Sequence, residues 1–252
     1  MRILVCYKYI PDENEISVNP DRTMKLDAAP WVISPYDLNA IEAGMKLAEA
    51  AGESTVEVLT AAGEVLDNTK MRKAVLSRGP AKMYGVKSAV CGDLFSTASL
   101  LAKAVRRIEG VDLVICGEGS GDMYSQELGN MLAAMLDVPA VNGVEELAYA
   151  GGAVLASRSN GSRRETLRLS GMAVVSVTSD ICRAHIPSMK EILAAGKKPV
   201  EIWDAAELGE CAAASETVSV LAPERAERKR VVFRESDEDG VDEFAKTIKK
   251  YL

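Results

Sequence analysis

The sequence predicts an α/β protein built on a doubly wound, mostly parallel sheet. In the first half, apolar runs of strand length alternate with segments whose apolar residues recur at helical spacing. The run from Val111 to Cys116 is almost continuously apolar, which is typical of a strand covered on both faces of a parallel sheet. After about residue 140 this alternation stops, so a different arrangement of strands is expected there.

The first half contains the expected β-α-β-α-β series. Ser34-Pro35-Tyr36-Asp37 is a plausible turn and cap before the first helix. Gly79-Pro80 ends the second helix, which runs through Val65, Met71 and Val75. Strands are expected at 3–7, 56–61, 81–86 and 111–116, and the other helices at 39–48 and 96–108.

The second half predicts an antiparallel extension of the same sheet and a C-terminal arm. Strand-like runs at 153–158, 165–169 and 173–178 follow one another without long helices between them. Residues 204–240 carry many charges, and 241–252 can form a helix with Phe244 and Ile248 on one side. We expect a domain over 1–203 and an arm over 204–252 that packs on another subunit, with a flexible tail as the alternative.

Composition excludes several classes of function. The chain has 252 residues, a formal net charge of −7 and a pI near 5.0. An acidic chain is not expected to bind nucleic acid, because phosphate contacts need a basic face. No apolar run is long enough for direct membrane insertion, and Arg2 leads directly into a short strand-like run instead of a signal peptide. A cytoplasmic protein is expected.

Cysteine and histidine usage argues against metal and triad chemistry. The five cysteines, at 6, 91, 116, 182 and 211, form no C-x-x-C pair, so we expect buried core thiols and no zinc cluster or disulfide framework. His185 is the single histidine, which excludes an H-E-x-x-H zinc site. No G-x-S-x-G elbow is present. No catalytic residue and no metal ligand is therefore predicted.

The segment from Val114 to Asp122 is a candidate phosphate site. A buried strand ends at Cys116, glycines follow at 117, 119 and 121, and a helix is expected from about Tyr124. The free N–H groups of a helix N-terminus favour an anion. The glycines match neither the dinucleotide fingerprint nor a P-loop, so a plain structural turn is the alternative.

A second segment, 184–199, is a candidate for binding a partner protein. Pro187 and Ser188 suit the start of a short helix, which puts Met189 in its first turn. We expect Ile186 and Ile192 to pack on the body and Met189 to point outward as a flexible apolar anchor. A methionine that fills the core is the alternative.

These segments, taken in order, resemble the β (small) subunit of electron-transfer flavoproteins over almost the full length of the chain. The details look closest to the branch associated with carnitine metabolism and nitrogen fixation. In the first half, the resemblance rests on Ile3 to Lys8 with Pro11-Asp12, and on residues 34–43, 76–79 and 112–117. Asp122-Met123-Tyr124 and Pro139 to Val144 extend it. In the second half, it rests on Arg158, residues 164–167 and 173–177, Ile186-Pro187-Ser188-Met189-Lys190 and Lys197-Lys198-Pro199.

The resemblance implies an adenine-nucleotide-binding, Rossmann-like fold and an electron carrier that is not an enzyme by itself. It implies an α subunit that holds most of the redox-active FAD, and AMP or a second FAD in this chain. A flavin-dependent dehydrogenase of the acyl-CoA or carnitinyl-CoA type would donate electrons, and a quinone oxidoreductase or ferredoxin is a possible acceptor. At the register of Met189, relatives insert a leucine into the dehydrogenase.

The resemblance also implies the residues that contact the cofactors. Tyr36 matches an aromatic residue near the flavin ring of relatives. The implied nucleotide contacts are Cys6, Tyr7, Asn39 or its neighbours, Thr60, Ala61, Gly63, and the loop and helix from Gly117 to Gly129.

Three departures from the family pattern affect these expectations. Gln126-Glu127-Leu128 replaces an Asn-Gln-Thr run, so a phosphate-binding threonine is absent and Gly119, Ser120, Gly121, Asp122 and Ser125 are expected to bind phosphate. The electron-bifurcating branch of the family has the pattern Asp-Gly-Asp-Thr-Ala-Gln-Val. Only Asp122 and an aliphatic residue at 128 match it here. Ser159 and Asn160 stand in place of acidic residues, and Met172 in place of a proline.

Two readings from other classes remain. One is a freestanding nucleotide-binding enzyme such as an ATP pyrophosphatase-like ligase, although no S-G-G-x-D-S motif is present. The other is a self-associating, nucleotide-binding regulator of the stress type.

Overall fold

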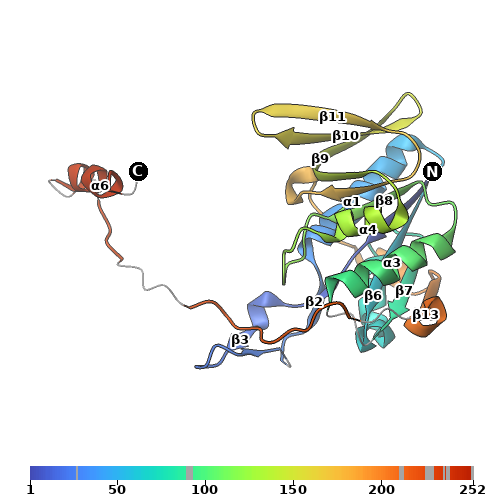
Figure 1. Cartoon of the computed structure of the whole chain (residues 1–252), viewed down its shortest axis with the longest axis horizontal. Helices are drawn as coiled ribbons and strands as arrows, with labels where there is room; N and C mark the ends of the chain where they lie inside the picture. The colour runs from blue at the N-terminus through green and yellow to red at the C-terminus, as the bar shows by residue number, and fades with distance from the viewer. Residues whose placement is uncertain are drawn as a thin grey trace.

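The computed structural model describes residues 1–26, 28–88, 93–209, 213–224, 230–234, 236 and 239–250. Its centre is a nine-stranded sheet in the order β11-β10-β9-β12-β8-β1-β6-β7-β13 (Figure 1). This α/β architecture confirms the predicted fold class.

The parallel part of the sheet holds the strands that position the site. Neighbouring strands from β12 to β13 all pair in parallel. The bounds are β1 Arg2–Cys6, β6 Thr55–Ala62, β7 Lys82–Lys87, β8 Leu113–Gly117, β12 Ala173–Val177 and β13 Val200–Asp204.

Helices cover both faces of the parallel strands. Helices α1 (Pro35–Ala51) and α2 (Thr69–Leu76) pack in one core with Val5, Val58 and Ile115. Helix α3 (Leu94–Ile108) packs with α4 (Leu128–Leu136) against Leu4 and Val114 on the other face. Because side chains alternate along a strand, each strand supplies both cores and reads as continuously apolar. Helix α5 (Met189–Ala195) lies against α2.

The antiparallel extension is present, but its strands differ from those predicted. It consists of β9 (Ala140–Ala150), β10 (Ala153–Asn160) and β11 (Arg163–Leu169). The prediction for 173–178 was wrong, because β12 lies in the parallel part of the sheet between β8 and β9. All five residues of β12 are buried, as a central strand requires, whereas β11 alternates between exposed and half-buried.

Strand β13 at the opposite edge was not predicted. Its anchor is Trp203, which stacks on Tyr84 with ring centroids 5.3 Å apart. The Arg107 guanidinium also lies over the indole, 4.9 Å from its centroid. A short run after Pro199 carries little periodic signal, and cross-strand aromatic packing stabilises it.

Smaller elements lie between the main ones. Strand β2 (Tyr9–Pro11) pairs with β5 (Trp31–Ile33), and β3 (Ser17–Val18) with β4 (Met24–Lys25). The segment expected as one helix through Val65 and Val75 is a 3₁₀ turn, Glu64–Asp67, followed by α2, because Asn68 caps α2 and begins a new helix. Other 3₁₀ turns are Glu13–Glu15, Ser179–Ile181 and Ala205–Leu208.

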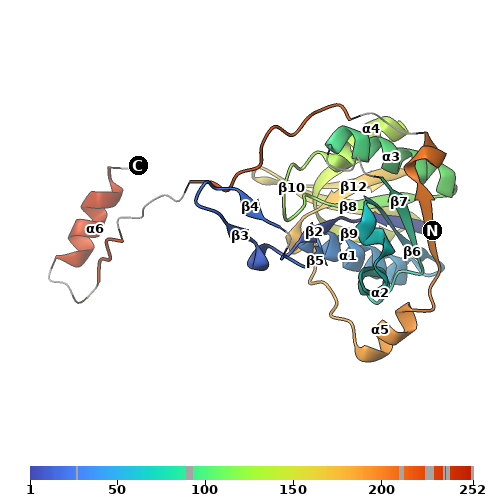
Figure 2. The same ribbon diagram turned by 90° about the horizontal axis from the view of Figure 1, so that it is seen from below.

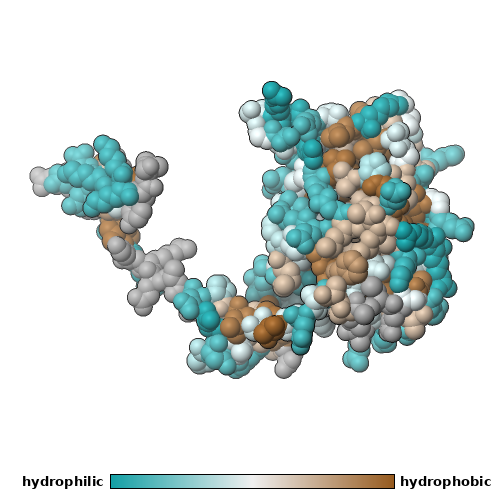
Figure 3. Space-filling view, in the orientation of Figure 1, coloured by the Kyte–Doolittle hydropathy of each residue, from teal (hydrophilic) through white to brown (hydrophobic). Residues whose placement is uncertain are grey.

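The C-terminal part runs back along the molecule and then leaves it. Leu221 forms a bridge with Thr23 beside the β3–β4 hairpin, where apolar side chains such as Val18 and Val220 are exposed (Figures 2 and 3). Helix α6 (Gly240–Ile248) lies apart from the sheet in both views. Tyr251 and Leu252, expected in this helix, lie outside the described residues. No helix in the described ranges has the length and apolar character needed to cross a membrane.

Close packing between α4 and β12 generates the first prediction. A Cβ added at Gly129 would lie 2.1 Å from Ser176 Oγ but 3.5 Å from Ser176 Cβ. Gly129→Ala should therefore lower the free energy of unfolding by roughly 1–3 kcal/mol, although alanine is the better helix former. The double variant Gly129→Ala/Ser176→Ala should recover most of the loss in urea unfolding. An equal loss in the single and double variants would contradict this packing.

Candidate functional site

A cavity of about 320 Å³ opens at the carboxyl ends of β1 and β8. The chain runs outward from β1 through β6 and β7 and then crosses to β8 on the other side of β1. The cavity thus lies where the strand order reverses, which is where open α/β sheets bind ligands. This position identifies it as the candidate site.

The floor of the cavity is apolar and carries two thiols. Cys6 ends β1, and Cys116 lies one residue before the end of the neighbouring parallel strand β8. Both line the cavity, together with Ala61 and Leu101. A hydrogen bond between the thiols and their burial raise the pKa of Cys116 well above its usual range. Both thiols are buried core groups, as predicted, and Cys182 is half-buried. Cys91 and Cys211 lie outside the described residues.

A buried carboxylate joins the two strand ends. Asp37, in the first turn of α1, accepts a hydrogen bond of 2.8 Å from the backbone N–H of Lys8 and a second from that of Gly117. Burial raises the pKa of Asp37 to about 7, although both N–H groups act in the opposite direction. The carboxylate is thereby the fixed point between α1, β1 and β8.

The loop from Gly117 to Glu127 forms one wall. A Cβ at Gly117 would lie 2.6 Å from Asp37 Oδ1, and one at Gly119 would lie 2.5 Å from the ring of Tyr124. Tyr124 and Gln126 adopt positive φ angles of 46° and 59°. The helix predicted from Tyr124 therefore begins four residues later, at Leu128, because left-handed residues cannot continue an α-helix.

This wall carries backbone donors that have no acceptor among the described residues. Within the described ranges, no backbone hydrogen bond is donated by Gly119, Ser120 or residues 125–130. Residues 128–130 are the first turn of α4, whose N–H groups have no acceptor within the helix. Together with the helix dipole, these donors suit an anion.

The charged side chains around the cavity are mostly acidic. Lys8 lines it, but its ammonium group is paired with Asp122 at 2.6 Å. Glu118, Glu127 and Asp93 also line it. An anionic ligand would therefore be bound chiefly by backbone N–H groups, and side-chain cations would contribute less.

The structure brings together eight of the residues expected to bind the nucleotide. They line the cavity from three strand ends and the loop, and they are Cys6, Tyr7, Ala61, Gly117, Gly119, Ser120, Ser125 and Gln126.

The other expected residues lie outside the lining. Thr60 shares the α1 and α2 face of β6 with Val58, and its hydroxyl has no partner among the described residues. Asn39 donates to the carbonyls of Ser179 and Cys182. Tyr36 lies against Tyr124, with ring centroids 5.0 Å apart. Of the remaining three, Gly63 begins a 3₁₀ turn, Gly121 N–H donates to Ser34, and Asp122 is paired with Lys8.

Sequence reasoning missed several lining residues. Asp93 caps α3 and could have been found as an N-cap residue before the apolar run of that helix. No sequence signal indicated Ser215 or Thr217, which come from the expected arm. The missed lining residues are Lys8, Asp37, Asp93, Leu94, Thr97, Leu101, Cys116, Ser215 and Thr217, whereas Glu118, Met123, Glu127 and Leu128 lie within the expected stretch from Gly117 to Gly129.

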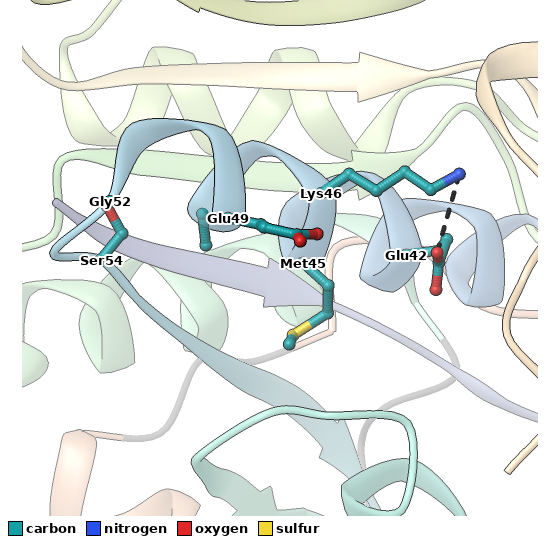
Figure 4. A pocket seen from close by; sticks show the side chains of 7 residues that line it. Glu42, Met45, Lys46, Glu49, Gly52 and Ser54 are labelled. Atoms are coloured by element: carbon teal, nitrogen blue, oxygen red, sulfur yellow. Dashed lines mark ion pairs between the residues drawn. The ribbon is translucent and has the colours of Figure 1, made fainter.

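A second hollow, of about 370 Å³, lies along the outside of α1 (Figure 4). Its polar groups include Glu42 and Lys46, which pair with each other at 3.7 Å, and Ser54, which precedes the amino end of β6. It lies away from the carboxyl ends of the strands and is the weaker candidate.

The expected docking segment exposes an apolar surface. The exposed fractions are 72% for Met189, 85% for Ile186 and 73% for Leu193, so the core alternative for Met189 is wrong. The expected packing of Ile186 and Ile192 is also wrong, because Ile192 is 38% exposed and Ala195 is the buried residue of α5. Polar contacts hold the segment instead: Ser188 caps α5, and Lys198 Nζ donates to the carbonyls of Leu76, Gly79 and Pro80. Pro187 precedes the cap.

The burial of Asp37 predicts a specific pH dependence of stability. Its folded pKa lies above its unfolded value, so its contribution is complete below about pH 4 and is lost as pH rises toward 7. Between pH 4.5 and 7.5 the wild type should lose roughly 2–4 kcal/mol of unfolding free energy relative to Asp37→Asn. Urea unfolding of both proteins across this range measures the difference. Parallel curves would show that Asp37 ionises normally in the folded state.

Comparison with known proteins places the chain in a family. Residues 23–208 match the family described as "Electron transfer flavoprotein domain". The match covers well over half of the chain and includes α1, the loop after β8, the antiparallel extension and α5.

Proposed function

Because the chain belongs to the electron transfer flavoprotein family, its general role is electron transfer, and we propose that it is the β subunit of a heterodimer. In this proposal the larger α subunit holds the redox-active FAD, and this chain binds an adenine nucleotide and docks a flavin dehydrogenase. The observation that supports the nucleotide site most is the cavity at the switch point, with unused N–H donors on one wall.

The residues present fit an adenine nucleotide. Cys6, Cys116, Ala61 and Leu101 would hold the flat, mostly apolar base, and the N–H groups of Gly119, Ser120 and the start of α4 would hold a phosphate. The cavity volume of about 320 Å³ is at the low end of the roughly 300–1,000 Å³ typical of small-molecule sites. It supports AMP over a second FAD, which remains the alternative.

The proposed mechanism is one of positioning. The flavin of the α subunit supplies the redox chemistry when bound, and this chain would supply surfaces that hold the complex. No residue of this chain is proposed to react, so an independent catalytic activity is not expected. The electron donor proposed is an acyl-CoA or carnitinyl-CoA type dehydrogenase, and the acceptor a quinone oxidoreductase or ferredoxin, in a cytoplasmic setting.

The docking surface proposed for the dehydrogenase is made by Ile186, Met189, Ile192 and Leu193. Met189, Ile192 and Leu193 lie on the short, capped helix α5, and Ile186 lies just before it. Exposed apolar side chains grouped in this way are typical of a protein contact site. Small transient interfaces can depend on one or two anchors. The C-terminal helix α6 stays a candidate contact with the α subunit.

The complex purified with its partner tests the proposal. We expect this chain to co-purify with a larger, yellow, flavin-binding chain, and mass spectrometry of the released ligands to find AMP in addition to FAD. The isolated chain should be colourless, because the cavity volume favours AMP over a flavin dinucleotide. A colourless self-associated protein that binds ATP would support the enzyme or regulator readings instead. Stoichiometric FAD on the isolated chain, with turnover, would contradict the subunit assignment.

Truncation of Met189 tests the docking surface. Met189→Ala should weaken docking of the dehydrogenase by roughly 1–3 kcal/mol, because a central apolar anchor is lost. Its melting temperature should stay unchanged, since the side chain is 72% exposed. Val218→Ala, at a residue that is 94% exposed and outside the docking segment, is the matched control. An unchanged electron-transfer rate in the Met189 variant would remove this residue from the interface.

A further inference from the structure

A short segment beyond the matched family domain forms part of the cavity. The match ends at residue 208, whereas Ser215 and Thr217 both line the cavity. The segment was expected to belong to an arm that serves another subunit. Its position beside the cavity instead relates it to the ligand.

One carboxylate holds this segment at the cavity. Asp93 Oδ2 accepts hydrogen bonds from the backbone N–H of Ser96 at 2.8 Å and of Ala214 at 3.2 Å. Asp93 Oδ1 accepts the hydroxyl of Ser215. The bond from Ser96 is sufficient to cap α3. The bonds from Ala214 and Ser215 therefore serve to hold residues 213–217. These donors hold the pKa of Asp93 well below its usual range, and Asp93 is therefore charged at neutral pH.

The far end of the segment is fixed to the β3–β4 hairpin. Leu221 bridges Thr23, and the N–H of Ala222 donates to the Arg22 carbonyl at 2.9 Å. Arg22 also pairs with Glu224 at 3.1 Å. Val218, between the two attachments, is 94% exposed. The segment therefore spans from the cavity to the hairpin with one attachment at each end.

We infer that residues 213–217, the closing segment, are a wall of the nucleotide cavity whose attachment to Asp93 controls how fast the nucleotide leaves. The inference rests on the proposed nucleotide site. Since Ser215 and Thr217 line the cavity from outside the sheet, a bound molecule lies between them and the strand ends. Loss of the Asp93–Ser215 bond would remove one of the two bonds that tie this wall to Asp93, while the Leu221 attachment stays in place.

The rate of AMP release from the full-length chain tests the inference. The protein is loaded with AMP carrying a methylanthraniloyl group on the ribose, and release is followed during a chase with unlabelled AMP. Ser215→Ala should speed release roughly tenfold, the effect of losing one hydrogen bond to a charged group. Asp93→Asn should act in the same direction and still cap α3, because asparagine is also a good N-cap residue. Ser219→Ala, just beyond the closing segment and outside the lining, should release AMP at the wild-type rate.

The outcomes separate this inference from the proposed function. If the wild type binds AMP and both Asp93→Asn and Ser215→Ala release it at the wild-type rate, the closing segment has no role and the nucleotide site stands. Equal acceleration by Ser219→Ala would likewise overturn the inference, because the effect would not depend on the cavity contact. If calorimetry detects no binding of AMP to the wild type, the proposed nucleotide site fails and this inference fails with it.

Discussion

The contact between Asp37 and two backbone N–H groups is the constraint on which the site depends. The carboxylate lies in the first turn of α1 and bonds the residues that follow β1 and end β8, so it fixes the switch point of the sheet. A side chain at Gly117 would collide with it. The loop after β8 must therefore leave the strand as glycine, and that turn places the start of α4 beside the strand ends. The raised pKa of Asp37 reflects the free-energy cost of burying this carboxylate.

The charge around the cavity explains how an anion could be bound without a cationic side chain. Lys8 is paired with Asp122, and Glu118 and Glu127 add negative charge. Backbone N–H groups at a helix start carry a partial positive charge, so they can bind an anion where the side chains are acidic. Tyr124 and Gln126 adopt left-handed φ angles in this loop, and the N–H groups of Gly119, Ser120 and residues 125–130 have no acceptor among the described residues.

Sequence patterns predicted the fold where residues are buried on both faces or strongly periodic. The strands around Val5, Val58 and Ile115 and the helices through Ile41 and Leu101 are of this kind. Strand β13 was missed because its stability comes from the contacts of Trp203 with Tyr84 and Arg107, which are distant in sequence. Strand β12 was assigned to the antiparallel extension because an apolar run does not indicate whether its strand pairs in parallel or antiparallel. Ser215 is held at the site by its hydrogen bond to Asp93, and no local sequence pattern predicts a contact between residues so far apart in sequence.

The central claim is that the loop after β8 and the start of α4 bind an adenine nucleotide through backbone N–H groups. Selective labelling with ¹⁵N-glycine and titration with AMP tests it most directly, because Gly117, Gly119 and Gly129 report from the loop and α4. Gly152 and Gly161, in the turns of the antiparallel extension, are internal controls. The account predicts saturable shifts of the amide signals at Gly117, Gly119 and Gly129, with Gly152 and Gly161 unmoved. Unchanged loop signals at saturating AMP, or shifts confined to the two control glycines, would contradict it.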